Sequence, residues 1–259
     1  MKCFLLRTAV IGFLAVLLLA GTGNASPQTS LLHGLFYNAN ELFKKGEYAA
    51  AAGEYEKILG YNAESGNVYY NLGNAYFKMG KLGKAIVNYE RARRLIPRDS
   101  DCGANLAYAL SLRENPLQEQ KLSWILGVPY VVSGYYTLDE LTFLAAWLYV
   151  IGVFLLMSGI LWKRSVAFIK YIVILDGVCL CLAAAAWGIK LWDVQVNRCA
   201  VVITASTDAK FAPADTAVTY FKLYEGTRIN LVGSNDQWLR IKTPDAKLGW
   251  VKKETLEQI

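Results

Sequence analysis

Few residues of this chain are spaced for acid–base or metal chemistry. The sequence of 259 residues contains one histidine, His33, which excludes a metal site built from several histidines. His33 has no neighbouring nucleophile in a recognisable catalytic pattern. The glycines between residues 60 and 80 are spaced for helices and turns rather than for a phosphate-binding loop. We therefore expect a binding protein without enzymatic activity, cofactor or metal.

The five cysteines are scattered, without the Cys-x-x-Cys spacing of a structural zinc site. Cys179 and Cys181 fall in an apolar run, and we interpret them as packing residues of a membrane helix. Cys102 and Cys199 lie in segments that we expect to be exported, where an oxidising environment permits disulfides. A disulfide between them is one possibility, and two free thiols are the other.

Asp176 is the ionisable residue in the most unusual setting. It lies inside the apolar run Val166–Ile189, near the middle of a predicted membrane span, where a carboxylate costs a few kcal/mol or more. Counting from the preceding loop places Gly152 opposite Asp176 and Tyr149 one turn further out. We expect a neutral Asp176 that hydrogen-bonds to Tyr149 or to a partner's helix. The alternatives are a group solvated by a local water defect and a cryptic intramembrane catalytic site.

Two apolar runs, residues 141–162 and 166–191, are each long enough for a transmembrane helix. The loop between them, residues 163–165, is so short that the two helices must form an antiparallel hairpin. Its lysine and arginine indicate the cytoplasmic side, and Lys170 can extend its ammonium group to the same headgroups. The segments before and after the hairpin should therefore lie together on the other side.

Residues 1–25 are typical of a secretory signal peptide. Lys2 and Arg7 precede an apolar run, and small residues lead to an expected cleavage site after Ala25. The alternative is an uncleaved membrane anchor. Either interpretation exports the residues that follow, in agreement with the charge of the hairpin loop.

The net charge of +6 does not indicate a nucleic-acid-binding protein. Residues 27–120 contain eleven Lys/Arg against ten Asp/Glu, and residues 196–259 contain nine against seven. Neither segment is basic enough for a nucleic-acid surface.

A 34-residue offset relates two halves of the segment before the hairpin, for example Phe43–Gly46 and Phe77–Gly80. The copy Gly66–Asp99 resembles the tetratricopeptide repeat, which packs two antiparallel helices through small residues. Its signature positions hold Tyr69, Leu72, Gly73, Tyr76, Ala85, Tyr89, Ala92 and Pro97. The copy Leu32–Ser65 is more degenerate, and a helix at Ser100–Arg113 should cap the stack.

Residues 30–115 are therefore predicted to form about two and a half tetratricopeptide repeats. The resemblance implies that extended peptides or partner helices bind to the concave face, which is built by the first helix of each repeat. That face should carry Phe36, Asn40, Phe43, Lys44, Tyr70, Asn74, Phe77 and Lys78.

Some members of the repeat family bind a C-terminal carboxylate with two asparagines and three basic residues. Asn40 and Asn71 match the asparagines, but the basic positions hold Phe36, Asp101 and Asn105. Because a carboxylate needs paired cations, we expect an aromatic and amide groove for a different ligand. The alternative is that Phe43 and Phe77 merely pack between the repeats.

Residues 116–140 are predicted to link the repeats to the hairpin along the membrane surface. The segment is apolar but too short to span, and we expect Gly127 and Pro129 to break it. Its aromatic residues, Trp124, Tyr130, Tyr135 and Tyr136, suit the level of the lipid headgroups.

Residues 197–259 change to short alternating strands separated by turn signals. The segment resembles a bacterial SH3-like domain through Tyr224–Thr227, Asp236–Ile241 and Leu248–Val251. Four aromatic side chains could form a peptide groove there, namely Tyr220, Phe221, Tyr224 and Trp238. Trp250 is expected to fill the barrel core.

The predicted fold class is multidomain: an all-α tetratricopeptide repeat stack, a two-helix transmembrane hairpin and a small all-β SH3-like barrel. This order resembles the aerotolerance-operon (Bat) family of bacterial membrane proteins. The resemblance implies partners such as von Willebrand factor A-type proteins and AAA+ components, and a role in envelope stress. We expect an adaptor in the cytoplasmic membrane whose soluble domains face the periplasm. The alternative is an envelope module whose barrel recognises peptidoglycan peptides.

Overall fold

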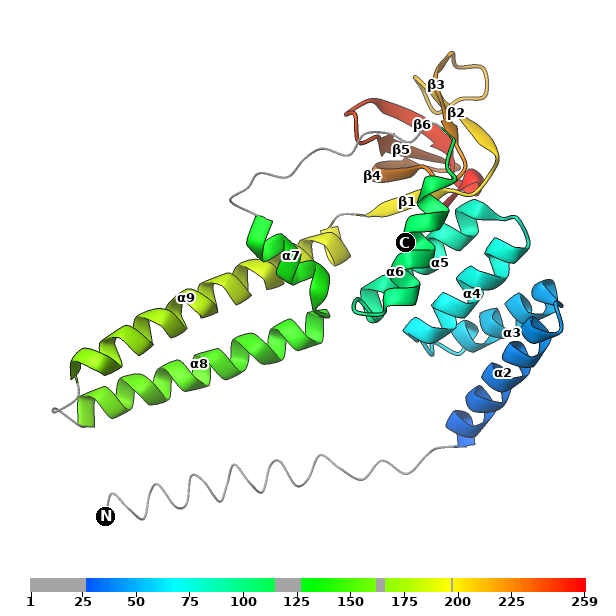
Figure 1. Ribbon diagram of the computed structural model, residues 1–259. Helices are drawn as coiled ribbons and strands as arrows, with labels where there is room; N and C mark the ends of the chain where they lie inside the picture. The colour runs from blue at the N-terminus through cyan, green and yellow to red at the C-terminus, as the bar shows by residue number, and fades with distance from the viewer. Residues whose placement is uncertain (1–26, 115–126, 162–165, 197) are drawn as a thin grey trace.

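The computed structural model describes residues 27–114, 127–161, 166–196 and 198–259 (Figure 1). It consists of a helical stack, two long apolar helices and an antiparallel sheet, which confirms the predicted multidomain fold class. The predicted signal peptide at 1–25 and the basic loop at 163–165 lie outside the described residues.

Five helices form the helical stack: α2 (Pro27–Lys44), α3 (Tyr48–Gly60), α4 (Gly66–Lys78), α5 (Leu82–Leu95) and α6 (Ser100–Ser111). The turns between α2 and α3 and between α4 and α5 each contain a glycine with positive φ, Gly46 at 82° and Gly80 at 73°. These two glycines lie 34 residues apart, as the repeat predicts. Asp99 caps α6, because its side chain accepts a hydrogen bond from the Cys102 backbone N–H at 2.8 Å.

Small residues bring the paired helices of the stack together. Ala51, Ala85 and Ala92 are fully buried. A Cβ atom at Gly73 would lie 2.7 Å from the ring of Tyr89, so only glycine lets α4 and α5 pack at this distance. The helical stack therefore closes by the small-residue packing that the repeat signature predicts.

The apolar pair consists of α8 (Leu138–Leu161) and α9 (Val166–Leu191). Both helices are long and apolar enough to cross a membrane, over Leu138–Gly159 and Lys170–Val194. A capping box begins α8: the Thr137 hydroxyl accepts from the Glu140 N–H at 3.2 Å, and the Glu140 carboxylate accepts from the Thr137 N–H at 3.0 Å. The helix therefore starts three residues before the predicted span.

A short helix, α7 (Gly127–Tyr135), precedes α8 and packs against α9. Gly127 and Pro129 were predicted to break this segment; Pro129 does not break α7, and Gly127 is its first residue. Pro129 lies in the first turn of α7, where a backbone N–H would have no acceptor within the helix, so proline is tolerated. The Lys190 ammonium group of α9 donates to the Ser133 carbonyl near the other end of α7, at 3.1 Å.

The sheet domain (residues 198–259) is an antiparallel sheet of seven strands in the order β3-β2-β6-β5-β4-β1-β7. The strands are β1 (Cys199–Val202), β2 (Ser206–Lys210), β3 (Thr219–Tyr224), β4 (Arg228–Asn235), β5 (Trp238–Lys242), β6 (Leu248–Lys252) and β7 (Leu256–Gln258). Alternation along β6 buries Gly249 and Val251 and leaves Trp250 half-buried on the outer side. Trp250 therefore does not fill the core, contrary to the prediction.

The helical stack and the sheet domain lie at the same end of the apolar pair, away from Leu161 at the end of α8 and Val166 at the start of α9 (Figure 1). The sheet domain packs against α5. Val201 belongs to the core of the helical stack, and Ile203 and Ile259 pack against that core. The two modules therefore share one apolar interface.

Candidate functional site: the groove of the helical stack

The first polar cluster of the helical stack is centred on Asn40 of α2. Its side-chain carbonyl accepts a hydrogen bond from the Tyr55 hydroxyl at 2.6 Å and another from the Asn71 amide at 3.1 Å. These bonds join α2, α3 and α4 and fix the orientation of the Asn40 carboxamide. Asn71, one of the two residues that match a carboxylate clamp, is therefore engaged in holding Asn40.

The second cluster repeats the first one 34 residues later. The Asn74 side-chain carbonyl accepts from the Tyr89 hydroxyl at 2.8 Å and from the Asn105 amide at 2.9 Å. Asn105 also donates to the Tyr70 hydroxyl at 3.1 Å. Asn105 of α6 thus takes the role in the second cluster that Asn71 of α4 has in the first. The side-chain oxygens of Asn40 and Asn74 are both occupied by these bonds. Among the described residues, their N–H₂ groups have no acceptor and remain available as donors, one repeat apart.

A groove of about 350 Å³ lies beside the second cluster. Its lining consists of Phe43, Asn74, Phe77, Lys78, Tyr89, Asn105 and Tyr108. The rings of Phe77 and Tyr108 form one wall, with centroids 5.8 Å apart. Four of these residues were predicted, namely Phe43, Asn74, Phe77 and Lys78. Phe43 and Phe77 also pack against the core of the helical stack, so each ring takes part both in packing and in the lining of the groove.

The other four predicted residues lie outside the lining of this groove. The Phe36 ring packs edge-on against Tyr55, with centroids 6.0 Å apart, and Tyr70 packs against Tyr89 at 6.1 Å. Asn40 belongs to the first polar cluster. Lys44 forms an exposed ion pair with Glu41 at 2.9 Å. The predicted face is therefore extended, and its hollow part lies between α4 and α6.

The pKa values of the clustered tyrosines are displaced by burial. Burial raises the pKa of Tyr55 to about 12, against an opposing hydrogen bond from Asn71. Burial also raises the pKa of Tyr89 and of Tyr76, and the Glu56 carboxylate that accepts from the Tyr76 hydroxyl adds to the latter shift. These three phenols therefore stay neutral and act as hydrogen-bond donors, and Tyr89 does so in the lining of the groove.

We expect the helical stack to lose stability in alkali. An unfolded tyrosine ionises near about pH 10, whereas Tyr55 stays neutral up to about pH 12 in the folded state. The unfolded chain thus releases protons first, so the stabilisation is complete below about pH 10 and is lost as the pH rises towards the folded pKa. Each such tyrosine should contribute a loss on the order of 1 kcal/mol at about pH 11. Denaturant unfolding at neutral pH and at about pH 11 measures this loss.

Tyr55→Phe should reduce this alkaline loss, although it lowers stability at neutral pH by removing the bond to Asn40. Tyr37→Phe is the matched control, because Tyr37 is 68% exposed on α2. The same alkaline loss in both variants would contradict the assignment to Tyr55.

The predicted aromatic groove of the sheet domain is not assembled. Tyr220 and Tyr224 lie in β3 and Trp238 in β5, with β2 and β6 between them in the sheet. Trp238 is only 8% exposed, because the Lys210 and Lys252 side chains cover its ring. Tyr220 instead packs against Phe211 in a tilted arrangement and edge-on against Phe221, with centroids 4.4 and 5.2 Å apart.

The structure places Asp176 opposite Gly152, as predicted. A Cβ atom at Gly152 would lie 2.6 Å from the Asp176 Oδ2 atom, so glycine makes room for the carboxyl group. Tyr149 is 61% exposed, and no hydrogen bond joins it to Asp176 in the described part of the apolar pair. The structure therefore does not bring the two predicted polar residues together.

Cys102 and Cys199 are both buried and both free, so the disulfide alternative is wrong. The Cys102 thiol contacts the Tyr89 carbonyl at 3.6 Å, and burial raises its pKa to about 11. The Cys199 sulfur lies 3.3 Å from the Asn230 side-chain oxygen. Each thiol thus occupies a separate packed environment.

Comparison with known proteins identifies the repeat. Residues 66–99 match the tetratricopeptide repeat family, and this segment contains α4 and α5. No curated protein sequence matches the chain. The solved structure described as NlpC1 from Trichomonas vaginalis is similar at 21% identity with a TM-score of 0.22, over 25% of this chain and 24% of that chain. The repeat match indicates a protein–protein interaction module.

Proposed function

We propose that the chain is a membrane-anchored scaffold that assembles partner proteins on the exported side of a membrane. The observation that carries the proposal is the arrangement of the modules: the groove-bearing helical stack and the sheet domain emerge from one end of the apolar pair (Figure 1). A hairpin that crosses a membrane would hold both modules on the same side.

The exposed side chains of the apolar pair support insertion into a membrane. Large apolar residues on α8 and α9 point away from the protein, among them Phe143, Phe154, Met157, Tyr171, Leu175 and Val178. Trp187 and Trp192, near the modules, are also exposed and suit the headgroup layer. The exposed Val128, Tyr130 and Val131 of α7 extend this layer.

The groove suits an extended peptide segment of a partner. The Asn40 and Asn74 amides can donate to peptide carbonyls one repeat apart, because their orientation is fixed by the two polar clusters. The Phe77 and Tyr108 wall can hold an apolar side chain of the peptide, and Lys78 can face an acidic one.

The following assignments of the sheet-domain fold, the family and the orientation rest on sequence resemblance alone. We propose an SH3-like barrel for the sheet domain, and membership of the aerotolerance-operon family with a periplasmic orientation. In that setting the partners would be von Willebrand factor A-type proteins and components of an AAA+ system. The function proposed is binding rather than catalysis.

Photo-crosslinking in native membranes tests the groove. A photoreactive amino acid at Tyr108, which is 59% exposed in the groove, should yield a defined protein adduct. The same amino acid at Tyr37, 68% exposed and outside the lining, is the matched control. Phe77→Glu should abolish the adduct at Tyr108, because it places a charge in the apolar wall. Equal yields at the two positions would refute the groove as the binding site.

A further inference from the structure

The outer face of strands β2, β6 and β5 alternates cations with indole rings. Trp250 of β6 lies directly opposite Lys210 of β2 on one side and Arg240 of β5 on the other. Lys252 lies opposite Trp238 in the same way. Since residues two apart share a face of a sheet, this surface is basic and aromatic.

The cations of this face differ in their partners. Lys252 pairs with Asp215 and Lys247 with Asp245, each at 2.8 Å. Arg240 on this face forms no ion pair with any carboxylate that the structure describes. The same is true of Lys242, which lies opposite Leu248. The end of the face near the β5–β6 turn therefore carries positive charge that the protein itself does not neutralise.

Trp250 stands among these cations with its indole half-buried. The ammonium group of Lys210 donates to the backbone oxygen of Asp215 and lies 5.8 Å from the centre of the Trp238 ring. Asp236 and Glu254 line a hollow near the start of β5 that also includes Lys252, at the opposite end of β5 from Lys242. The free part of the face thus combines an apolar ring with cations, which suits a layer of anionic groups above an apolar medium.

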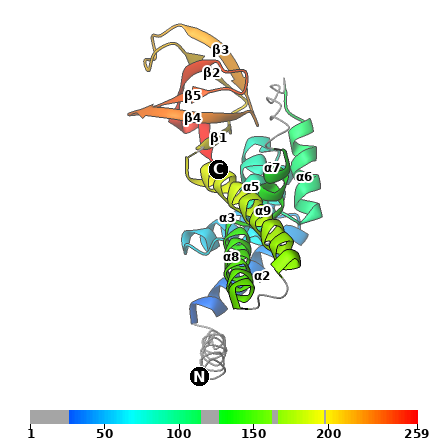
Figure 2. The same cartoon turned by 90° about the vertical axis from the view of Figure 1, so that its left-hand side faces the viewer.

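We propose that this face, centred on Trp250, Arg240 and Lys242, binds anionic phospholipid headgroups of the membrane that holds the hairpin. The inference rests on the proposed membrane insertion of α8 and α9. Only two residues separate the end of the helical segment at Val196 from the start of β1 at Cys199, so the sheet domain is tethered close to the headgroups. In both ribbon views β4, the neighbour of β5, lies nearer to the apolar pair than β3 does (Figures 1 and 2).

Photoactivatable lipids test the proposal on the full chain in nanodiscs. One preparation contains phosphatidylglycerol with a photoreactive headgroup, and the other contains phosphatidylcholine with the same probe. Adducts within residues 238–252, mapped by mass spectrometry, should be several-fold more abundant with phosphatidylglycerol. Arg240→Gln and Lys242→Gln should each lower this yield roughly fivefold. Lys222→Gln, at an exposed position of β3, should leave it unchanged.

A lipid with the probe in its acyl chain separates this proposal from the membrane proposal beneath it. Acyl-chain adducts on α8 and α9 demonstrate insertion. If they form while residues 238–252 show equal yields with both headgroups, or none, the lipid-binding face is refuted and the scaffold stands. If acyl-chain adducts do not form, both the membrane insertion of α8 and α9 and the lipid-binding face are refuted.

Discussion

Gly83→Val is expected to detach the sheet domain from the helical stack. Gly83 lies in α5, and a Cβ atom there would be 2.4 Å from the Val202 carbonyl oxygen and 2.8 Å from the Ile203 Cα atom. Both obstacles are backbone atoms of the sheet domain, so no side-chain rotation relieves the overlap. Overpacking of this kind costs about 1–3 kcal/mol where the structure can adjust. The interface should therefore open, while valine remains compatible with the helical backbone of α5.

Hydrogen exchange of the full chain in nanodiscs measures the separation. The Ile203 N–H, which donates to the Thr255 carbonyl at 3.0 Å within the sheet domain, should exchange faster in Gly83→Val, because Ile203 loses the cover of the helical stack. The matched control is Gly103→Val in α6, because no atom lies within 4 Å of a Cβ at that helical glycine. Unchanged protection at Ile203 in Gly83→Val would show that the two modules do not depend on this contact.

The close approach at Gly83 is part of the contact between the sheet domain and α5. The sheet domain packs against α5, which contributes Tyr89 to the groove, whereas the other lining residues come from α2, α4 and α6. The Glu225 carboxylate accepts from the Gly83 N–H at 2.8 Å, and Arg91 pairs with Glu257 at 2.8 Å. The groove therefore remains available to a partner while the sheet domain covers another part of the helical stack.

The helical stack was predictable because its signal is local and repeated. The 34-residue offset predicts the helices, their glycine turns and the small residues between them. Asn71 and Asn105 obey the same offset, so the second polar cluster could have been derived from the first one. The internal repetition is thus a more direct signal for this cluster than the cations that a carboxylate clamp would need.

The two tryptophans of the sheet domain do not follow the general preference of aromatic residues for the core. Leu239 and Ile241 are buried in β5, so period-two alternation already places Trp238 on the outer face. The same alternation from Val251 places Trp250 outside. For these two residues, strand alternation is therefore a better guide than the general preference of large aromatic residues for the core. Trp238 is buried for another reason, which is that lysines from two strands lie over it.

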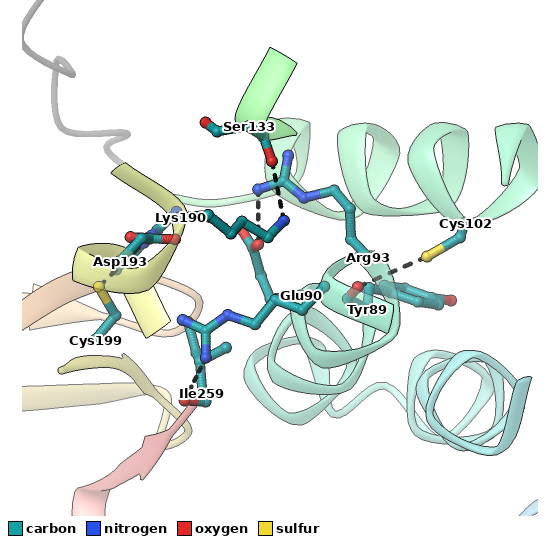
Figure 3. Close-up of polar contacts among 11 residues, drawn as sticks. Tyr89, Glu90, Arg93, Cys102, Ser133, Lys190, Asp193, Cys199 and Ile259 are labelled. Carbon is teal, nitrogen blue, oxygen red and sulfur yellow. Dashed lines mark hydrogen bonds and ion pairs between the residues drawn. The ribbon is translucent and has the colours of Figure 1, made fainter. Parts of the chain in front are cut away.

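The junction of the three modules could not be predicted, because it joins residues far apart in the sequence. Glu90 comes from α5, Asp193 from the π-helix Trp192–Val196 that follows α9, and Cys199 from β1, and they gather at one place (Figure 3). Arg228 of β4 lies among them, 3.7 Å from Glu90, 4.0 Å from Asp193 and 3.5 Å from the Cys199 sulfur. No periodicity along the chain indicates such a meeting.

Arg228→Gln should destabilise this junction by about 2 kcal/mol, which is typical of a hydrogen-bonded charged group. Burial opposes the charge of Arg228, but Glu90, Cys199 and Asp193 outweigh it and raise the pKa of the guanidinium, so the arginine stays charged. The Glu90 side chain is 8% exposed and would keep only Arg93, at 2.9 Å. Denaturant unfolding of the full chain in nanodiscs measures the loss.

Lys57→Gln is the matched control, since it removes an ion pair with Glu54 whose lysine side chain is 62% exposed. Such exposed pairs contribute less than about 1 kcal/mol. In a double-mutant cycle, Glu90→Gln should recover part of the cost of Arg228→Gln, because it removes the charge that would otherwise stay buried. A cost of Arg228→Gln no larger than that of Lys57→Gln would mean that apolar contacts alone hold the sheet domain to α5. In that case the scaffold would be joined by Val201, Ile203 and Ile259 rather than by its buried charges.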